Sequence, residues 1–275
     1  MDIADARRKV EEVGFWWHSI DFGNGVVSKG RKSPERLASE LAALQLPDLK
    51  GKTVLDIGAW DGYFSFRCEQ LGAAQVVALD HYVWSLDLPK HNAYMEECKA
   101  RGVVPELYET RPDLWDPVRL PGKRGFDTAK EILGSSVTPV VGDFMEMDLH
   151  SLGAFDVVLF LGVLYHVKDP FLALRRLAQV CRGTAIIETA AIHVPELGAR
   201  SICEFYESNE LSSDVSNWWA PNVNAVCGMC RAAGFKDVRA LVAPSRRRAL
   251  RRRIVSLLTQ QHSPQHYRLV VQAMK

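Results

Sequence analysis

The chain has 275 residues, 47% of them hydrophobic and 24% charged, with a formal net charge of +1. This is ordinary globular composition, long enough for one large core with or without a lid, and we expect a single elaborated domain. The near-neutral charge excludes a surface that attracts polyanions everywhere, so any contact with nucleic acid must come from a local patch.

No targeting or membrane segment is evident. The residues from Asp2 to Glu12 are rich in charge, and the longest apolar run, 157–165, is about half a membrane span. We expect a cytoplasmic protein without a membrane span. The six cysteines are scattered, which indicates reduced thiols, and the C-x-x-C of Cys227 and Cys230 has no second pair to complete a zinc set. A buried pair on one helix face is favoured over a redox or metal role, and we predict no metal.

Short β-branched runs alternate with stretches of helical period, a pattern that predicts a mostly parallel sheet wrapped by helices. In chain order, the predicted strands are 53–57, 75–79, 138–141, 157–161, 184–188, 237–242 and 267–274. The predicted helices between them are 34–44, 62–71, 127–133, 170–180 and 223–233.

Two segments interrupt this alternation. Residues 83–124 follow the second strand and residues 189–222 follow the fifth, and both leave from carboxyl ends of strands, where open α/β sheets bind ligands. We expect them to form walls or a lid over a substrate pocket, with the segment around Trp17 and His18 as a third wall. The alternative, that they are structural covers only, stays open.

Six arginines lie between Arg246 and Arg253. They are suited to RNA phosphate or a membrane surface, although a solvated helix face or loop is the commoner explanation.

The first strand ends in a glycine turn. Asp56 is followed by Gly58, Ala59, Trp60 and Gly62, and then by a helix, an arrangement that brings backbone N–H groups close to a ligand. Because Trp60 stands where a dinucleotide fingerprint has its middle glycine, the turn is less suited to a pyrophosphate.

Two further acids follow the next strands. Asp80 ends the second strand, where a carboxylate can accept both hydroxyls of a ribose, and His81 comes next. Asp143 and Phe144 follow the third strand and offer a carboxylate for an adenine amino group and a ring for its face. Each acid alone could be a helix cap, but three at successive strand ends favour a nucleoside site.

In these features the sequence resembles the class I S-adenosylmethionine (SAM) dependent methyltransferases. The resemblance implies a Rossmann-like α/β fold with a seven-stranded, mostly parallel sheet, a helical cap over residues 1–50, and a SAM-binding domain over residues 51–275 with inserts at 83–124 and 189–222. In that family the three acids hold methionine, ribose and adenine in turn. The implied cofactor-binding residues are Asp56, Gly58, Ala59, Trp60, Gly62, Asp80, His81, Asp143, Phe144 and Leu161.

A narrower resemblance rests on Gly162-Val163-Leu164-Tyr165-His166, together with Trp17-His18-Ser19-Ile20-Asp21 and Ile187-Glu188-Thr189. These motifs are similar to the branch that contains the tRNA wobble-uridine methyltransferases and carboxymethyltransferases. Members that use carboxy-SAM hold its extra carboxylate with a lysine, a tyrosine and an arginine. Tyr165 matches the tyrosine and Arg268 the arginine, whereas neither Lys9 nor Lys29 lies in a motif that matches the lysine.

Methyl transfer needs an in-line acceptor, a dry site and a proton acceptor. His166 is the candidate base, since an unperturbed imidazole titrates near pH 6.5, and its alternative role is to orient a loop. Tyr165 is expected to line the sulfonium pocket. The candidate residues for acceptor binding are Trp17, His18, Glu188, Glu204, Trp219 and Arg268.

We therefore predict methyl transfer from SAM to a hydroxyl or amine of a small molecule, such as a sugar or natural product, because aromatics outnumber basic residues in the inserts. One alternative is modification of the tRNA wobble uridine with SAM or carboxy-SAM, using the arginine run as an electrostatic contact. A catalytically silent SAM-binding protein is a second alternative, and a nicotinamide oxidoreductase is disfavoured by Trp60. The oligomeric state is left open.

Overall fold

The computed structural model describes residues 1–194, 197–242 and 264–275. The helices are α1 (Ile3–Glu12), α2 (Pro34–Leu44), α3 (Tyr63–Gln70), α4 (Tyr82–Ser85), α5 (Leu88–Arg101), α6 (Arg124–Leu133), α7 (Pro170–Val180) and α8 (Val223–Ala232). The strands are β1 (Thr53–Ile57), β2 (Gln75–Asp80), β3 (Thr138–Val141), β4 (Phe155–Leu161), β5 (Cys181–His193), β6 (Cys203–Phe205), β7 (Trp219–Pro221), β8 (Asp237–Ala240) and β9 (Gln265–Met274). Short 3-10 turns include η3 (Leu149–Leu152) and η4 (Leu164–His166).

The described residues form one seven-stranded sheet in the order β3-β2-β1-β4-β5-β9-β8, with a separate two-stranded sheet of β6 and β7. Strands β1 to β5 are parallel in the large sheet, and β9 runs antiparallel to both β5 and β8. The strand order reverses between β1 and β4, so the carboxyl ends of these strands border a topological switch point. This arrangement confirms the predicted α/β fold with a seven-stranded, mostly parallel sheet.

Two apolar layers cover the faces of the sheet. On one face α7 and α8 pack against alternate side chains of the central strands, with Leu174 and Leu177 fully buried. On the other face α3 and α6 supply Phe66 and Phe126, whose ring centroids are 5.3 Å apart. The central strands read as continuous apolar runs because both faces are buried in this way.

Side-chain caps fix where several helices begin. Asp169 accepts a hydrogen bond from the backbone N–H of Leu172, at 2.8 Å, immediately before Pro170 opens α7. Asn222 does the same for Ala225 at the start of α8, at 2.9 Å. A cap and a proline at the first helical position are the usual signals of a helix start, and α2 and α7 have the predicted bounds.

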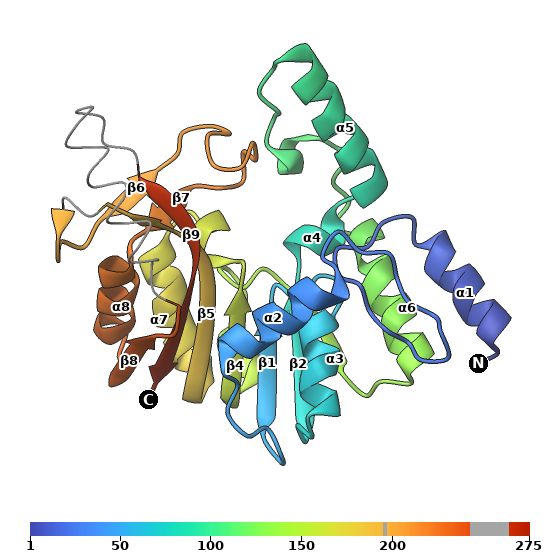
Figure 1. Ribbon diagram of the computed structural model, residues 1–275, viewed down its shortest axis with the longest axis horizontal. Coiled ribbons are helices and arrows are strands. Elements are labelled where there is room, and N and C mark those ends of the chain that lie inside the picture. Colours follow the sequence, from blue (N-terminus) through green and yellow to red (C-terminus); the bar gives the residue numbers. More distant parts are fainter. Residues whose placement is uncertain (195–196, 243–263) are drawn as a thin grey trace.

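The two inserts stand on the same edge of the sheet, at the carboxyl ends of its parallel strands (Figure 1). The insert at 83–124 contains α5, which projects beyond that edge, and the insert at 189–222 contains β6 and β7. The amino-terminal α1 packs beside α6. The division into a cap at 1–50 and a domain at 51–275 stays a prediction.

The structure differs from the predicted elements mainly in the inserts. Helices α1 and α5 and the small β6–β7 sheet were not predicted, and β5 extends well past residue 188 into the second insert. The arginine run between Arg246 and Arg253 lies outside the described residues. Cys227 and Cys230 are buried, free thiols on α8, as predicted. In the described part of the chain, none of the helices is long and apolar enough to span a bilayer.

Candidate cofactor and acceptor site

The three predicted acids lie on adjacent strands. Asp56 is in β1 and Asp80 ends β2, the neighbour of β1, while Asp143 follows β3, the neighbour of β2. The main-chain oxygen of Asp80 accepts a hydrogen bond from Gly142 N at 3.2 Å, which ties the ends of β2 and β3 together. The predicted juxtaposition of these strand ends is therefore present, and the binding roles of the acids stay predictions.

The glycine turn after β1 uses most of its own N–H groups. Gly58 N and Ala59 N both donate to the main-chain oxygen of Leu79, at 2.8 and 3.3 Å. Trp60 N donates to the Asp80 carboxylate at 2.9 Å. The N–H groups of Gly58, Ala59 and Trp60 thus all bond to β2, and the cofactor-binding roles of these residues stay predictions.

The glycines of the turn are required by packing within the protein. A Cβ on Gly58 would lie 2.5 Å from Val163 Cγ2, and one on Gly62 would meet the ring of Phe66 at the same distance. Trp60 also adopts left-handed backbone, with φ of 53°, a conformation that favours glycine. Its indole Nε1 is buried without a hydrogen-bond partner among the described residues, so the turn keeps one unsatisfied donor.

Asp56 is a structural residue in this geometry. Its side chain is 2% exposed and accepts a 2.6 Å hydrogen bond from Ser65 Oγ, which fastens α3 to β1. Burial raises the pKa of Asp56 to about 6. Its carboxylate is enclosed between the strand and the helix, and its assignment to the cofactor stays a prediction.

Asp80 is the acid best suited to hold a ribose. Its carboxylate accepts from Trp60 N at 2.9 Å and from Val83 N at 3.1 Å, so both oxygens are fixed in place. A carboxylate oxygen can accept more than one hydrogen bond, so these contacts are compatible with a ribose hydroxyl as a further donor. Burial raises the pKa of Asp80 to about 6, so it is largely ionised at pH 7.

Four other predicted cofactor residues have different surroundings. Asp143 is partly exposed and forms a local turn by accepting from Met145 N at 2.8 Å. Phe144 is 6% exposed and packs in the core with its ring 5.5 Å from that of Phe160, so it does not present a free face to an adenine. His81 is partly exposed against Trp115, and Leu161 is partly buried opposite Glu188.

The amino-terminal segment docks onto the glycine turn through Asp61, a residue that the sequence did not single out. The buried Asp61 carboxylate accepts from Trp17 N at 3.0 Å and from His18 N at 2.9 Å, and it also bonds the Nδ1 atom of His18. The Trp17 ring stacks on Trp60, with centroids 4.6 Å apart. His18 is buried by this contact, so it is an anchor of the segment and not a free acceptor-binding side chain.

A charged cluster lies around Gly162, just past β4. The Arg268 guanidinium forms a two-bonded ion pair with Glu188 and lies 4.8 Å from the centroid of the Tyr165 ring. A Cβ on Gly162 would be within 4 Å of all three side chains. The structure thus brings together Tyr165 and Arg268, which the resemblance had paired, with Glu188, which the sequence had predicted apart from them.

His166 lies beside Tyr165, with ring centroids 4.1 Å apart, and contacts the second insert. Its Nδ1 atom is 3.0 Å from the main-chain oxygen of Ser216 and 3.0 Å from Ser216 Oγ. Burial lowers the pKa of His166. Ser216 was missed because only the fold brings it to His166.

The remaining predicted residues lie in the second insert. Trp219 contacts the loop after β4 through its Nε1, which donates to the main-chain oxygen of Lys168 at 3.3 Å. Glu204 instead accepts from Tyr206 at 2.7 Å and lies near His266. Glu204 therefore belongs to a separate polar group and not to the cluster around Tyr165.

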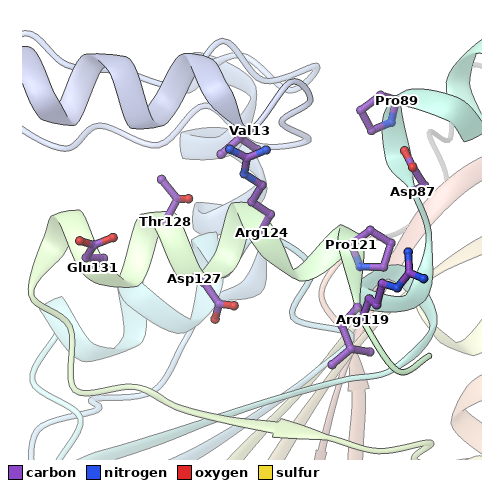
Figure 2. Close-up of a pocket in the computed structure, with 10 residues that line it drawn as sticks. Val13, Asp87, Pro89, Arg119, Pro121, Arg124, Asp127, Thr128 and Glu131 are labelled. Carbon is purple, nitrogen blue, oxygen red and sulfur yellow. The ribbon is translucent and has the colours of Figure 1, made fainter. Parts of the chain in front are cut away.

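Figure 2 shows a surface hollow of about 500 Å³ away from these residues. It lies between the end of α1, the start of α5 and the outer side of α6, and its lining includes Asp87, Arg119, Arg124 and Glu131. None of its lining residues is a predicted site residue. Among the described residues there is also no group of three or more histidine, cysteine or acidic side chains that could hold a metal.

Residues 30–240 match the family model described as a methyltransferase domain, and the chain belongs to this family. With its sheet order, the chain has the fold of the class I SAM-dependent methyltransferases, and SAM is the cofactor of this domain. The fixed carboxylate of Asp80 beside the strand end that carries Asp143 fits an adenosyl group. Asp80 would hold the ribose, and the residues around Gly162 would face the sulfonium end.

Curated relatives with similar sequences are tRNA U34 carboxymethyltransferases. That of Campylobacter hominis is 28% identical over 193 residues, which cover 69% of this chain and 52% of the relative. The enzyme of Alteromonas mediterranea is 26% identical over 197 residues, which cover 70% of this chain and 47% of the relative. The chain thus spans about half the length of these relatives.

Solved structures agree on the fold. The N-terminal domain of EvdMO1, determined in the presence of SAH and D-fucose, matches with a TM-score of 0.60 at 17% identity, covering 100% of this chain and 97% of that one. The phosphoethanolamine N-methyltransferase 2 of Haemonchus contortus, in complex with SAM, matches with a TM-score of 0.51 at 16% identity. The match covers 90% of this chain and 54% of that one. At these identities the likeness concerns the fold alone.

Proposed function

We propose that the chain transfers a methyl group from SAM to a hydroxyl or amine of a small molecule, with His166 as the general base. SAM supplies a methyl group already activated by its sulfonium sulfur, so the protein has to orient the acceptor, exclude water and take up one proton. The observation that carries the proposal is the position of His166, whose Nδ1 faces a main-chain oxygen.

A main-chain oxygen accepts hydrogen bonds but cannot donate them, so the neutral imidazole of His166 carries its proton on Nδ1. Nε2 is then the unprotonated nitrogen, and it has no hydrogen-bond partner among the described residues. Because burial lowers the pKa of His166, the ring is neutral at pH 7. Nε2 can therefore accept the proton that the acceptor hydroxyl or amine loses.

Aromatic side chains of the second insert favour a compact acceptor. Trp218 N donates to the main-chain oxygen of Tyr165 at 2.8 Å, which brings the second insert against the site. Phe205 is 54% exposed, and its ring centroid is 5.0 Å from that of Trp219. Exposed ring faces of this kind stack on a sugar ring or a planar natural product, with polar groups nearby fixing orientation.

The ion pair of Glu188 and Arg268 supports SAM as the donor in place of carboxy-SAM. The guanidinium that would meet the extra carboxylate of carboxy-SAM already binds both oxygens of Glu188. A second carboxylate beside Glu188 would add like-charge repulsion, which disfavours its binding.

Modification of a tRNA wobble uridine is the second candidate, because the curated relatives carry that activity in their names. They are related over about half of their own length. This candidate requires binding of tRNA, which is salt-sensitive when it depends on arginine–phosphate contacts.

The test is methyl transfer from radiolabelled SAM to two acceptor pools, one of nucleotide sugars and phenolic natural products and one of unmodified tRNA. The proposal expects label in the small-molecule pool, with a loss of about 10²–10⁴-fold in His166→Gln while SAH affinity is retained. The exposed His150→Gln is the matched control. Label in tRNA alone, with tRNA affinity that falls steeply with salt, would replace the proposal with the second candidate.

A further inference from the structure

A polar chain runs from His166 into both inserts. Ser216 Oγ lies 3.0 Å from His166 Nδ1 and donates to Asp214 Oδ1 at 2.8 Å. The same Asp214 oxygen accepts from Ser216 N at 2.9 Å. Asp214 and Ser216 belong to the second insert, so this segment supplies the polar partners of His166.

Tyr108 extends the chain to the first insert. Its hydroxyl donates to Asp214 Oδ1 at 3.0 Å, across 106 positions of sequence. The Tyr108 side chain is almost fully buried, and its ring lies 4.4 Å from that of His91 at the start of α5. The two inserts therefore meet at Asp214, whose carboxylate is held from both sides.

The directions of these hydrogen bonds are determined by the groups that take part. The Asp214 carboxylate can only accept, so the Ser216 hydroxyl proton points to it and the Ser216 oxygen presents a lone pair to His166 Nδ1. The Ser216 main-chain oxygen presents a second lone pair to the same nitrogen. Both contacts favour the proton on Nδ1.

We propose that Asp214 and Ser216 are positioning residues for His166, which hold its imidazole as the Nδ1–H tautomer and keep Nε2 free for the acceptor's proton, and that Tyr108 fixes Asp214 in this role. The inference rests on the proposed function, because it gives the base its orienting partners. In this arrangement Asp214 and Ser216 orient His166 in the way that a third group orients the base of a catalytic triad. It also gives the two inserts a shared purpose.

Asp214 controls the tautomer by holding Ser216, because its carboxylate accepts from both the N–H and the hydroxyl of that residue. Without the carboxylate, the Ser216 main-chain oxygen is no longer fixed against His166 Nδ1, and the hydroxyl is free to turn its proton towards Nδ1. Both changes favour the Nε2–H tautomer, whose Nε2 cannot accept a proton. Other charged groups near the ring are Glu188 and Arg268, which neutralise each other as a pair. Asp214 is therefore the acid whose removal should change the tautomer.

The test reads the tautomer directly, by long-range ¹⁵N–¹H NMR of the chain labelled on its histidines, with the His166 signals assigned by their loss in His166→Gln. The unsubstituted chain should show the Nδ1–H tautomer at neutral pH. Asp214→Ala should raise the Nε2–H fraction at least several-fold, and Asp214→Asn, which keeps an acceptor oxygen, should restore the original tautomer. Glu207→Ala, an exposed acid in the same insert, is the control and should change nothing.

An Nε2–H tautomer in the unsubstituted chain would overturn the inference, even if no variant folds. An unaltered tautomer in folded Asp214→Ala would overturn it as well. The measurement needs no acceptor, so it fails or succeeds separately from the proposed function. Loss of the base role in the methyl-transfer assay with the expected tautomer present would reject His166 as base but leave its orientation by Asp214 and Ser216 established.

Discussion

Arg268 in β9 and Glu188 in β5 lie on the same face of the sheet. The two strands are antiparallel neighbours, and the residue opposite Glu188 is Val270, two positions from Arg268. Their two-bonded ion pair sits beside Tyr165. Because the Arg268 guanidinium already pairs with a carboxylate of the protein, this ion pair affects whether the site prefers SAM or carboxy-SAM as the donor.

Glu188→Gln should shift donor preference towards carboxy-SAM. The change removes the negative charge that pairs with Arg268, and a charged hydrogen bond from the freed guanidinium to the donor carboxylate should improve its affinity by about tenfold. Isothermal titration of SAM and carboxy-SAM against both proteins measures the ratio. Glu204→Gln, in the separate polar group with Tyr206, is the control, and an unaltered ratio in Glu188→Gln would reject this role of the pair.

Asp61→Ala should destabilise the fold by about 3–5 kcal/mol, because His18 and two backbone amides lose a buried charged acceptor. Urea unfolding measures the change. Asp113→Ala, which removes an exposed ion pair with Arg111, should change stability far less. Equal effects of the two substitutions would contradict the anchoring role of Asp61.

The sequence predicted most of the sheet because its central strands are continuous apolar runs, and it predicted α2 and α7 because a proline follows a capping residue. It did not predict α5, which lies in a segment interrupted by prolines and aromatics. Its weak apolar periodicity gave no helical signal, since α5 projects from the sheet and buries few side chains.

The site was only partly predictable. Residues within one motif, such as Tyr165 and His166, could be recognised from their place after β4. Contacts such as Asp61 with His18 or Ser216 with His166 join residues 43 and 50 positions apart, and only the folded chain brings them together. The hydrogen bond from Ser65 to the Asp56 carboxylate was likewise not predicted from the sequence.

Asp56→Asn should flatten the pH dependence of stability between about pH 4 and 6. Because burial raises the pKa of Asp56 from 3.8 to about 6, the folded state binds a proton more tightly than the unfolded state across this window. Its contribution to the free energy of unfolding therefore falls as pH rises through the window, by an amount on the order of 2–3 kcal/mol. Asp80 contributes in the same direction and remains in the variant.

Urea unfolding at several pH values tests this expectation. The difference in free energy of unfolding between pH 4.5 and pH 7 should be smaller in Asp56→Asn than in the unsubstituted chain. Asp237→Asn, at an exposed position, should leave this difference in free energy of unfolding unaltered. A difference that stays the same in Asp56→Asn would show that this carboxyl is not held in the buried state described above.

The most direct test of an adenosyl site at the strand ends is the affinity for SAH of the unsubstituted chain and of Asp80→Asn, measured by isothermal titration at pH 7.5. The amide keeps an oxygen for only one of the two backbone donors and loses the charged acceptor for the ribose hydroxyls, so binding should weaken by about 10–100-fold. Affinities that agree within about twofold in a folded variant would contradict the placement of the ribose at Asp80.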